Sequence, residues 1–540
     1  MRHGTKLIPI AIYFFTVSTL VFAVSTVAAQ DSPSTTSLTS EINRQLSNAW
    51  KRDSVNPAGP CTDREFVRRV YLDLVGRIPT IGEVDTFLLD ARPDKRDHLV
   101  DVLLDSEDYV QHFTDVIDTL LMGRADEGKY KQRSSSQWRS FLEDFLRENR
   151  PWNEVAAEIL LARPDGDSNR GAVWFLYERN DNHQAIAESI APAFFGVRIE
   201  CAQCHDHMNA DEIKQSDYWG LVAFFNRSKN TKTKRGPRVS ESAVGGFSEF
   251  ADLTGDSYPN LLSFLDRGPV KEERPEAGKD QEDADELYQS AKRKDGTRIP
   301  KFSRRSEFVE EVMADNPRLA LAMVNRVWAI LMGRGIVHPF DEMDSVHPPS
   351  HPELLQVLAD GFVNSRYNVR EVVRWIAKSD AYQLSSMRPN GVDDPATFAW
   401  YLERPLTAEQ MARATQLIVR GQFQNDDPLI GSFRQQFRDV LPDTFVAPVS
   451  DALYMSNHPT LDQYLADSND AQHLRQKLMQ LPDHSQRCDS LFASIFQRSP
   501  AETERKAVEN YLQQRESHLG QAIDQVIWSM LTSAEFRLNH

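Results

Sequence analysis

Apolar residues along most of the chain recur at the three- and four-residue spacing of an amphipathic helix. Thr62 and Glu65 have the spacing of a capping box, in which a hydroxyl and a carboxylate bind the free amides of a first helical turn. After them, Phe66, Val70 and Leu74 fall on one helical face. Strand-like alternation bounded by turn residues is scarce. The pattern therefore predicts an all-α fold.

Further helix starts are predicted from capping residues. Thr80 and Glu83 form a second capping box, and Ser134 and Gln137 form a third. Asn316 is followed by a proline, which suits the first turn of a helix because its missing N–H has no partner there in any case. A helix is expected after each of these positions.

Composition divides the chain into segments. Two helical regions are joined by a polar, charged connector that contains Lys271-Glu272-Glu273-Arg274. The predicted segments are a signal peptide at 1–29, a polar leader at 30–58, a first helical region at 59–230, the connector at 231–305 and a second helical region at 306–540.

The N-terminus has the pattern of a secretory signal peptide. Arg2 and Lys6 give a basic start, and an apolar run then extends to Val24. Val27 and Ala29 supply the small residues that a signal peptidase accepts, so cleavage is expected after Ala29. The alternative is an uncleaved N-terminal anchor, because the run approaches spanning length. We expect an exported protein, periplasmic, in the cell envelope or extracellular, without a membrane span after cleavage.

The charge of the chain limits its partners. The formal net charge is −17, with 79 Asp and Glu against 62 Lys and Arg. An acidic surface repels phosphate backbones, so nucleic-acid binding is not expected. Hydrophobic residues make up 40% of the chain, which is ordinary for a globular protein.

The run Cys201-Ala202-Gln203-Cys204-His205 carries the clearest chemistry. It is a C-x-x-C-H motif, the pattern of a covalently attached c-type haem. Cys201 and Cys204 would form thioethers with the two haem vinyl groups, and His205 would be the proximal ligand of the iron. Haem attachment of this kind takes place after export, so the motif and the signal peptide support each other.

Two other interpretations of the motif remain open. Zinc is one, because His207 extends the run to C-x-x-C-H-x-H and gives four potential ligands within seven residues. A structural disulfide between the two thiols is the other, because export permits oxidation. If the motif holds haem, Cys61 and Cys488 remain and could pair.

Other candidate chemistry is weak. The chain has no G-x-S-x-G, H-E-x-x-H, P-loop or dinucleotide fingerprint, so the sequence does not decide whether the protein is an enzyme. Asp341, Glu342 and Asp344 could hold a cation, but they are also typical of a solvated loop.

The motifs resemble those of planctomycete-type secreted proteins in which a cytochrome c-like domain of unknown function precedes a second planctomycete domain of unknown function. The first domain is matched by the runs that begin at Phe66, Phe195 and Asp217 and read FVRRVYLDLVGRIPT, FGVRIECAQCHDH and DYWG. The second is matched by those that begin at Asn325 and Pro348 and read NRVW and PPSHPELL, among others. The resemblance implies a cytochrome-like first domain and no established activity.

The chain departs from the family after His207. The family usually continues with a proline and an aromatic residue, whereas this chain continues with Met208 to Ile213, which would leave a haem edge less covered. Some relatives also carry a separate haem domain in front, which is not found here. An external redox partner or an envelope component is therefore expected.

A sixth iron ligand would have to come from a distant part of the chain, because His207 is too close to His205 in sequence. Within the family-like run PPSHPELL, His351 is the candidate for this distal ligand; capping of a helix is its alternative role. The sequence thus predicts an exported c-type haem-binding protein for electron transfer or haem-linked redox chemistry. The alternative is a non-catalytic extracellular helical scaffold or binding protein with a structural disulfide or metal site at the motif.

Overall fold

The computed structural model describes Met1 and residues 35–164, 170–275, 281–289, 293, 295, 297–437, 454, 461, 464–465 and 471–540. Apart from Met1, the predicted signal peptide lies outside the described residues. Within the described parts, no helix is both long enough and apolar enough to cross a membrane. The segment Pro33–His540 forms one compact unit.

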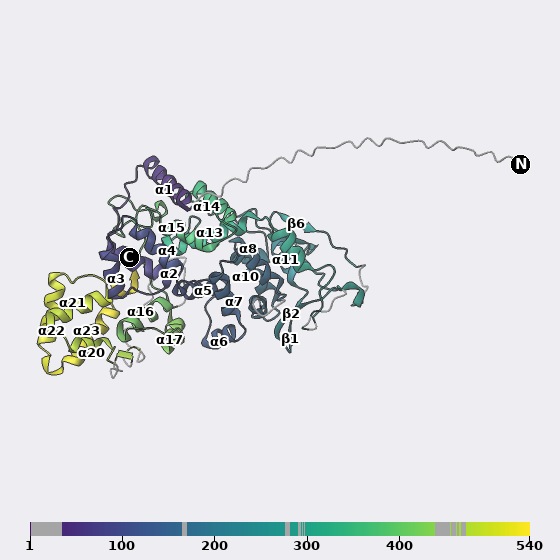
Figure 1. Cartoon of the computed structure of the whole chain (residues 1–540). Helices are drawn as coiled ribbons and strands as arrows, with labels where there is room; N and C mark the ends of the chain where they lie inside the picture. The colour runs from purple at the N-terminus through teal and green to yellow at the C-terminus, as the bar shows by residue number, and fades with distance from the viewer. Residues whose placement is uncertain are drawn as a thin grey trace. The chain divides into compact units, whose positions relative to one another are not determined.

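Helices follow one another through the first part of this unit (Figure 1). They are α1 Thr35–Arg52, α2 Asp63–Val75, α3 Ile81–Leu89, α4 Lys95–Leu104, α5 Glu107–Met122, α6 Glu127–Ser135, α7 Trp138–Arg147, α8 Trp152–Leu161, α9 Trp174–Tyr177, α10 His183–Phe195 and α11 Gln215–Phe225, with 3-10 turns η1 Arg170–Val173 and η2 Glu200–Gln203.

Within the described residues, six short strands follow, and then a second series of helices, with one short strand inside that series and one at its end. The strands are β1 Ser228–Thr233, β2 Gly236–Glu241, β3 Glu249–Ala251, β4 Ser257–Pro259, β5 Leu262–Phe264, β6 Arg267–Val270, β7 Arg404–Pro405 and β8 Leu538–Asn539. The later helices are α12 Arg304–Glu307, α13 Pro317–Met332, α14 Pro352–Asn364, α15 Val369–Ala377, α16 Ala408–Arg420, α17 Pro428–Gln436, α20 Leu474–Met479, α21 His484–Ile495, α22 Glu502–Gln513, α23 Leu519–Leu531 and α24 Ala534–Arg537.

Most predicted capping residues begin helices. Thr80 and Glu83 form the reciprocal capping box before α3, with each side chain accepting from the backbone N–H of the other at 3.2 and 2.7 Å. Asn316 accepts from a first-turn N–H of α13 at 3.0 Å.

The first predicted box is half formed, because Thr62 accepts from the N–H of Glu65 at 3.2 Å while the Glu65 carboxylate pairs with Arg69, and the third is wrong. Ser134 belongs to the last turn of α6, and Gln137, with φ of 65°, begins α7 without a side-chain cap.

The predicted polar leader contains helix α1. Leu38, Ile42, Leu46 and Ala49 are buried along one face of this helix, at spacings of four and three residues. The face packs against α14 and α15. Residues 35–52 therefore belong to the folded unit, although their overall polarity had favoured a leader.

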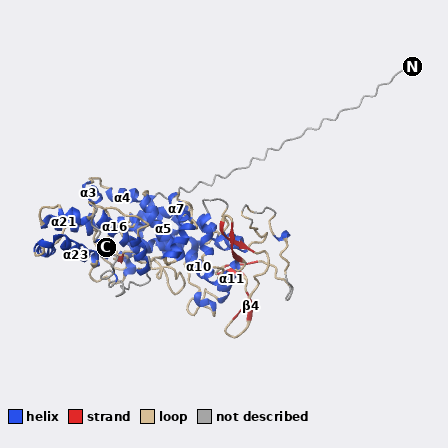
Figure 2. Ribbon diagram, turned by 90° about the horizontal axis from the view of Figure 1, so that it is seen from below, coloured by secondary structure: helices blue, strands red, loops and turns tan. Residues whose placement is uncertain are grey.

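The connector contains strands, so the fold is helix-rich rather than purely α-helical. Within the described residues, β1–β2, β3–β4 and β5–β6 are two-stranded antiparallel pairs (Figure 2). Leu262 and Phe264 of β5 are buried, and the Phe264 ring lies 5.2 Å from that of Phe195 on α10. These strands were missed because they are short and carry few apolar positions.

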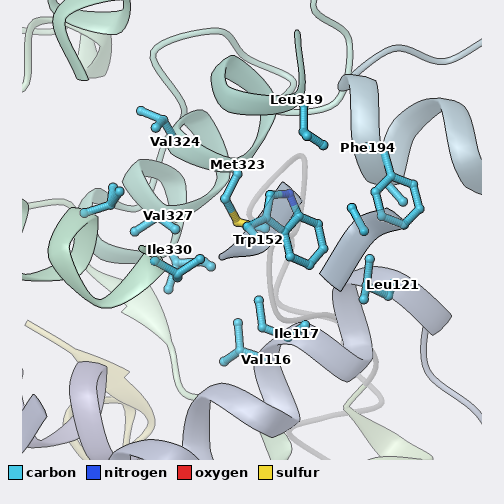
Figure 3. Close-up of a cluster of buried hydrophobic side chains, with 14 of the residues drawn as sticks. Val116, Ile117, Leu121, Trp152, Phe194, Leu319, Met323, Val324, Val327 and Ile330 are labelled. Atoms are coloured by element: carbon cyan, nitrogen blue, oxygen red, sulfur yellow. The ribbon is translucent and has the colours of Figure 1, made fainter. Parts of the chain in front are cut away.

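One hydrophobic core joins the two predicted helical regions. Helices α5, α8 and α10 of the first region meet α13 of the second (Figure 3). The ring of Trp152 on α8 stacks on that of Phe194 on α10 at 5.7 Å, and Met323 and Val327 of α13 complete the cluster. Burial of this apolar surface makes the two regions one packed unit.

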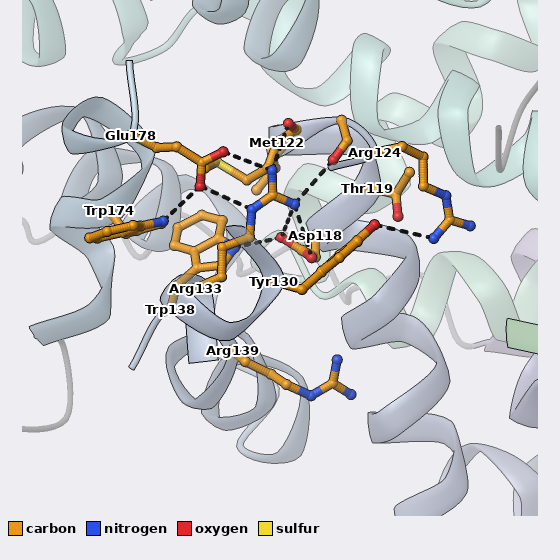
Figure 4. Close-up of polar contacts among 12 residues, drawn as sticks. Asp118, Thr119, Met122, Arg124, Tyr130, Arg133, Trp138, Arg139, Trp174 and Glu178 are labelled. Atoms are coloured by element: carbon orange, nitrogen blue, oxygen red, sulfur yellow. Dashed lines mark hydrogen bonds and ion pairs between the residues drawn. The ribbon is translucent and has the colours of Figure 1, made fainter. Parts of the chain in front are cut away.

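Buried ionic contacts reinforce the first helical region (Figure 4). The Arg133 guanidinium pairs with Asp118 at 3.3 Å and with Glu178 at 2.9 Å. Trp138 and Trp174 each donate an indole N–H to one of these carboxylates at 2.8 Å. Burial raises the pKa of Asp118, while Arg133 opposes that shift. The cluster fixes α5, α6, α7 and α9 relative to one another.

A second buried cluster joins the beginning, middle and end of the chain. The carboxylate of Asp73 on α2 accepts from the hydroxyls of Tyr382 and Tyr401 at 2.8 and 2.9 Å. It also accepts from Asn539 at 2.6 Å and pairs with Arg404. We call these five residues the Asp73 cluster.

Candidate functional site

The C-x-x-C-H motif follows the end of α10. Gly196 ends this helix with φ of 66°, and its carbonyl accepts from the N–H of Met343 at 2.8 Å. The chain then forms η2, in which the N–H of Ala202 donates to the carbonyl of Ile199 at 2.9 Å. Ile199 and Ala202 are buried, so the inner side of the motif is anchored in the core.

Helix α11 holds the motif from the other side. The carbonyl of Gln203 accepts from the indole N–H of Trp219 at 3.1 Å and from the amide of Gln215 at 3.3 Å. The carboxylate of Asp206 accepts from the N–H of Gln215 at 2.9 Å, at the first residue of α11. The loop is therefore tied to a helix on both sides of Cys204.

The buried carboxyl of Asp217 supports the start of α11. It accepts from the N–H of Lys214 at 2.8 Å, and burial raises its pKa to about 6. Backbone donation and the charge of Lys214 oppose this shift, while the neighbouring Asp206 adds to it. Asp217 is the first residue of the family-like run DYWG, but its burial and its role at the start of α11 are seen only in the structure.

The two motif thiols face solvent. Cys201 and Cys204 are both exposed and free, whereas Cys61 and Cys488 are both buried and free. The buried pair lies in two different hydrophobic clusters, so the possible disulfide between them is not formed. Burial raises the pKa of both buried thiols, to about 11 for Cys488. Reagents and cofactors can reach the motif thiols but not the other two.

The ring of His205 has a defined orientation. Its Nδ1 lies 2.6 Å from the carbonyl oxygen of Asp206. A carbonyl only accepts, so Nδ1 must carry the proton, and the neutral ring keeps its lone pair on Nε2. This is the arrangement in which histidine binds a metal through Nε2 while its other nitrogen is held by a hydrogen bond.

The ring of His207 has the opposite tautomer. Its Nδ1 accepts from the backbone N–H groups of Ala210 at 2.9 Å and Asn209 at 3.3 Å. Nδ1 is therefore unprotonated, and Nε2 carries the proton in the neutral ring. The His207 lone pair is used by the loop backbone, which leaves the ring unsuited to bind a metal in this conformation.

The segment after the motif folds as a tight loop. The N–H of His207 donates to the carbonyl of Ile213 at 2.9 Å, and Ala210 and Ile213 are buried. Met208 is 81% exposed and is the large apolar side chain that this segment leaves in solvent. The departure from the family pattern thus gives an exposed loop tip rather than an aromatic cover.

His351 lies in a different environment. It precedes α14 without a side-chain cap, and its Nδ1 is 3.1 Å from the hydroxyl of Ser350. Its ring centroid lies 5.5 Å from that of Phe398, and burial lowers its pKa. No contact between His351 and the motif loop is found in the described parts of the chain. The proposed distal ligand is therefore not brought to the thiols.

The loop that contains Asp341, Glu342 and Asp344 is hydrogen-bonded to the segment that follows the motif. Ser345 donates its N–H and hydroxyl to the carboxylate of Glu212 at 2.6 and 2.8 Å. Ligand atoms of Glu342, Asp344 and His347 lie within 4.8 Å of one another, the one such group of three among the described residues. His347, which sequence reasoning missed, is 2.9 Å from Asp344 through Nδ1.

The geometry thus defines a helix-rich protein with an exposed C-x-x-C-H loop on its surface. Two family models match the chain. Residues 41–230 match PSCyt2, a protein of unknown function (DUF1549), and residues 304–436 match PSD1, a protein of unknown function (DUF1553). The chain therefore carries these two domains of unknown function in this order, which confirms the resemblance found in the motifs. No curated protein and no solved structure matched the chain.

Proposed function

We propose that the protein is an exported c-type haem-binding protein that serves electron transfer or haem-linked redox chemistry. Cys201 and Cys204 would attach the haem, and His205 would bind its iron. The observation that carries this proposal is the hydrogen bond from His205 Nδ1 to the carbonyl of Asp206 at 2.6 Å, because it keeps the proton on Nδ1 and leaves the lone pair on Nε2 for a metal. The matched PSCyt2 model carries a cytochrome label in its name, and its function is described as unknown.

The thiols fit covalent attachment. Both are free and exposed, and the backbone between them is fixed by the buried side chain of Ala202 and by bonds to the carbonyl of Gln203. A fixed backbone keeps both sulfur atoms on the accessible side of the loop. Haem c, when bound, supplies a one-electron centre whose potential depends on its ligands and surroundings.

The residues around the motif have separable roles. Asp206 holds the proton on Nδ1 of His205, which makes Nε2 a better donor to a metal. Gln215 and Trp219 hold the loop against α11. A group attached at such a surface loop would lie close to solvent, where an external redox partner or an envelope component could approach it.

Zinc is the weaker alternative. A site made of both thiols, His205 and His207 needs a free lone pair on each ring, and the His207 Nδ1 pair is used by two backbone N–H groups. Export remains part of the proposal because haem is attached to C-x-x-C-H after export. It rests on the predicted signal peptide at 1–29, with cleavage after Ala29.

The visible spectrum tests the proposal. The full chain is expressed with its signal peptide in a host competent in cytochrome c maturation. We expect an intense Soret band that remains on the polypeptide after denaturation. Double Cys201→Ser, Cys204→Ser replacement should abolish the band, and double Cys61→Ser, Cys488→Ser replacement should keep it. A colourless wild-type protein would reject the proposal and favour the scaffold with a disulfide.

Two histidine variants separate haem from zinc. His205→Ala should keep the covalent haem but shift the Soret band, because the proximal ligand is lost. His207→Ala should keep the wild-type band, since this ring binds the backbone of its own loop. Zinc bound at one equivalent and lost equally in both variants would support the metal site instead.

A further inference from the structure

The hairpin of β1 and β2 concentrates positive charge in an acidic chain. From Arg227 to Arg238 the sequence has six Lys or Arg residues and no Asp or Glu. The whole chain, in contrast, has a formal net charge of −17. Charge of one sign gathered on a short element creates a local field that attracts ligands of the opposite sign. The hairpin lies outside the C-x-x-C-H loop and is not used by the proposed redox function.

The hairpin presents these charges on a rigid backbone. Thr233 pairs with Gly236, so Lys234 and Arg235 alone form the connecting turn. The Thr233 hydroxyl donates to the carbonyl of Gly236 at 3.0 Å and accepts from the N–H of Arg235 at 3.1 Å. Gly236 has φ of 94°, a backbone conformation that a residue with a side chain would adopt only with strain. The turn therefore holds two adjacent cations at the hairpin tip.

The inner and outer cations of the hairpin differ in their ion pairs with described residues. The outer residues Arg227 and Arg238 pair with Glu272 and Asp295 at 2.8 and 2.7 Å. Four inner cations are exposed, and in the described part of the chain none of them forms an ion pair. These four, called the cationic wall below, are Lys229, Lys232, Lys234 and Arg235.

The cationic wall borders a large cavity. Its volume is about 1220 Å³, which exceeds what a single inorganic anion needs and suits a segment of a chain molecule. Asp283 and Asp295 also line the cavity, but Asp283 accepts from the hydroxyl of Tyr288 at 2.6 Å and from Arg298 at 3.1 Å. Asp295 pairs with Arg238. These carboxylates do not neutralise the wall.

Two further carboxylates in the cavity, those of Asp181 and Glu241, also have hydrogen-bond or ion-pair partners. Asp181 accepts from the N–H of Asn230 at 2.6 Å. Glu241 accepts from the hydroxyl of Ser303 at 2.8 Å and is paired with Arg163 and Arg305. Burial by itself would raise the pKa of Glu241, but the positive charges of the two arginines lower it below its ordinary value. The positive charge of the wall is therefore in excess.

The rest of the lining favours a hydroxylated ligand. Hydroxyl groups come from Ser228, Thr231, Thr233, Ser240, Ser242 and Thr297. Among the described lining residues, Val244 is the one aliphatic side chain, and Tyr288 is the one Phe, Tyr or Trp. Amphipathic membrane-binding elements add apolar anchors to their cations, and proteins that bind single-stranded nucleic acid stack its bases on aromatic side chains, so this lining favours neither ligand. The Tyr288 ring is already covered by the Arg298 guanidinium at 3.7 Å.

We infer that this cavity binds an acidic polysaccharide. Its carboxylate or sulfate groups pair with the cationic wall, and its hydroxyl groups donate to serine and threonine oxygens, most of whose own protons already have acceptors within the protein. The chemistry shared by the two anion types is a repeated single negative charge on a hydroxylated chain. This binding site is separate from the C-x-x-C-H loop and does not depend on haem.

Binding is measured by calorimetry with the full purified chain and five probes. Alginate carries carboxylates, dextran sulfate carries sulfates, and dextran is the neutral control. We expect binding of one or both acidic polysaccharides, weakened by salt, and none of dextran. Comparing the affinity for alginate with that for dextran sulfate shows whether the cavity prefers carboxylate or sulfate groups. Tighter binding of oligo-dT or phosphatidylglycerol vesicles, equal binding of dextran, or no binding of either acidic polymer would overturn the inference.

A charge-matched pair of variants localises the site. The wall variant is Lys229→Gln, Lys232→Gln, Lys234→Gln and Arg235→Gln. The control variant removes four exposed cations elsewhere: Lys51→Gln, Lys131→Gln, Arg388→Gln and Lys506→Gln.

We expect the wall variant to bind the acidic polymer about tenfold or more weakly, with a shallower salt dependence, and the control to stay within about twofold. Both should keep the wild-type circular dichroism spectrum and melting temperature, because all eight side chains are exposed. An equal loss in the two variants would mean that net charge, and not the cavity, drives binding.

Discussion

Removing the carboxylate of Asp73 should destabilise the whole folded unit. Asp73 is 2% exposed and accepts from Tyr382, Tyr401 and Asn539 in addition to its pairing with Arg404. In Asp73→Ala, the guanidinium loses its counter-charge, and three other donors lose their acceptor. The contacts join α2 to segments more than 300 positions later in the chain.

The expected cost follows from the partners left behind. Breaking a buried ion pair by removing one member costs about 3–5 kcal/mol. Each buried donor left without an acceptor costs about 1–3 kcal/mol, although water entering the new space offsets part of this. These contributions overlap, so we expect the free energy of unfolding to fall by about 3–6 kcal/mol. That is a large share of the roughly 5–15 kcal/mol typical of a folded domain.

Urea unfolding and melting temperature give the measurement. Asp393→Ala is the control, because Asp393 pairs with Arg388 at 3.1 Å where both side chains are more than half exposed. This control should cost less than about 1 kcal/mol. Double Asp73→Ala, Arg404→Met replacement should recover part of the loss, since no unpaired charge remains buried. If Asp73→Ala costs no more than Asp393→Ala, the cluster does not hold the parts of the chain together.

Two further predictions concern a buried histidine and a buried glycine. Burial lowers the pKa of His112 from 6.5 to about 4. The neutral His112 ring therefore contributes to the free energy of unfolding above pH 6.5, and this contribution is lost as the pH falls toward 4. In urea unfolding measured between pH 7 and pH 4, His112→Gln should lose roughly 3 kcal/mol less of its free energy of unfolding than the wild type does. The variant His98→Gln, at an exposed histidine, should lose as much as the wild type. Gly196→Ala should cost about 1–3 kcal/mol, because φ is 66° and a Cβ would lie 2.6 Å from the Met343 sulfur. Gly82→Ala, with no atom within 4 Å of its Cβ, is the control and should leave the melting temperature unchanged or slightly raised.

Capping residues predicted the start of a helix correctly where no other helix runs through the capping position. Thr80 and Asn316 begin α3 and α13 because their side chains bind the nearest free N–H groups, which needs no distant residue. Ser134 failed as a cap because α6 continues through it. Helix α1 was missed although Leu38 and Ile42 show its spacing, because the segment is polar on average.

The donor set of the candidate site could be predicted from the sequence, but its surroundings could not. Cys201, Cys204 and His205 are adjacent in sequence, so their spacing alone identifies the motif. The tautomer of the neutral His205 ring depends on where the Asp206 carbonyl points, which only the folded loop defines. Trp219 reaches the motif because α11 folds back on η2. The cationic wall also required the structure, since its excess charge depends on which carboxylates already have partners.

Haem attachment is tested most directly by the mass of the motif peptide. The full chain, matured in a host that attaches haem c, is digested, and the peptide containing Cys201 and Cys204 is measured. We expect this peptide to carry the added mass of one haem, bound through both sulfur atoms, and to absorb in the Soret region. An unmodified peptide, or one with the two thiols joined as a disulfide, would contradict the proposed function.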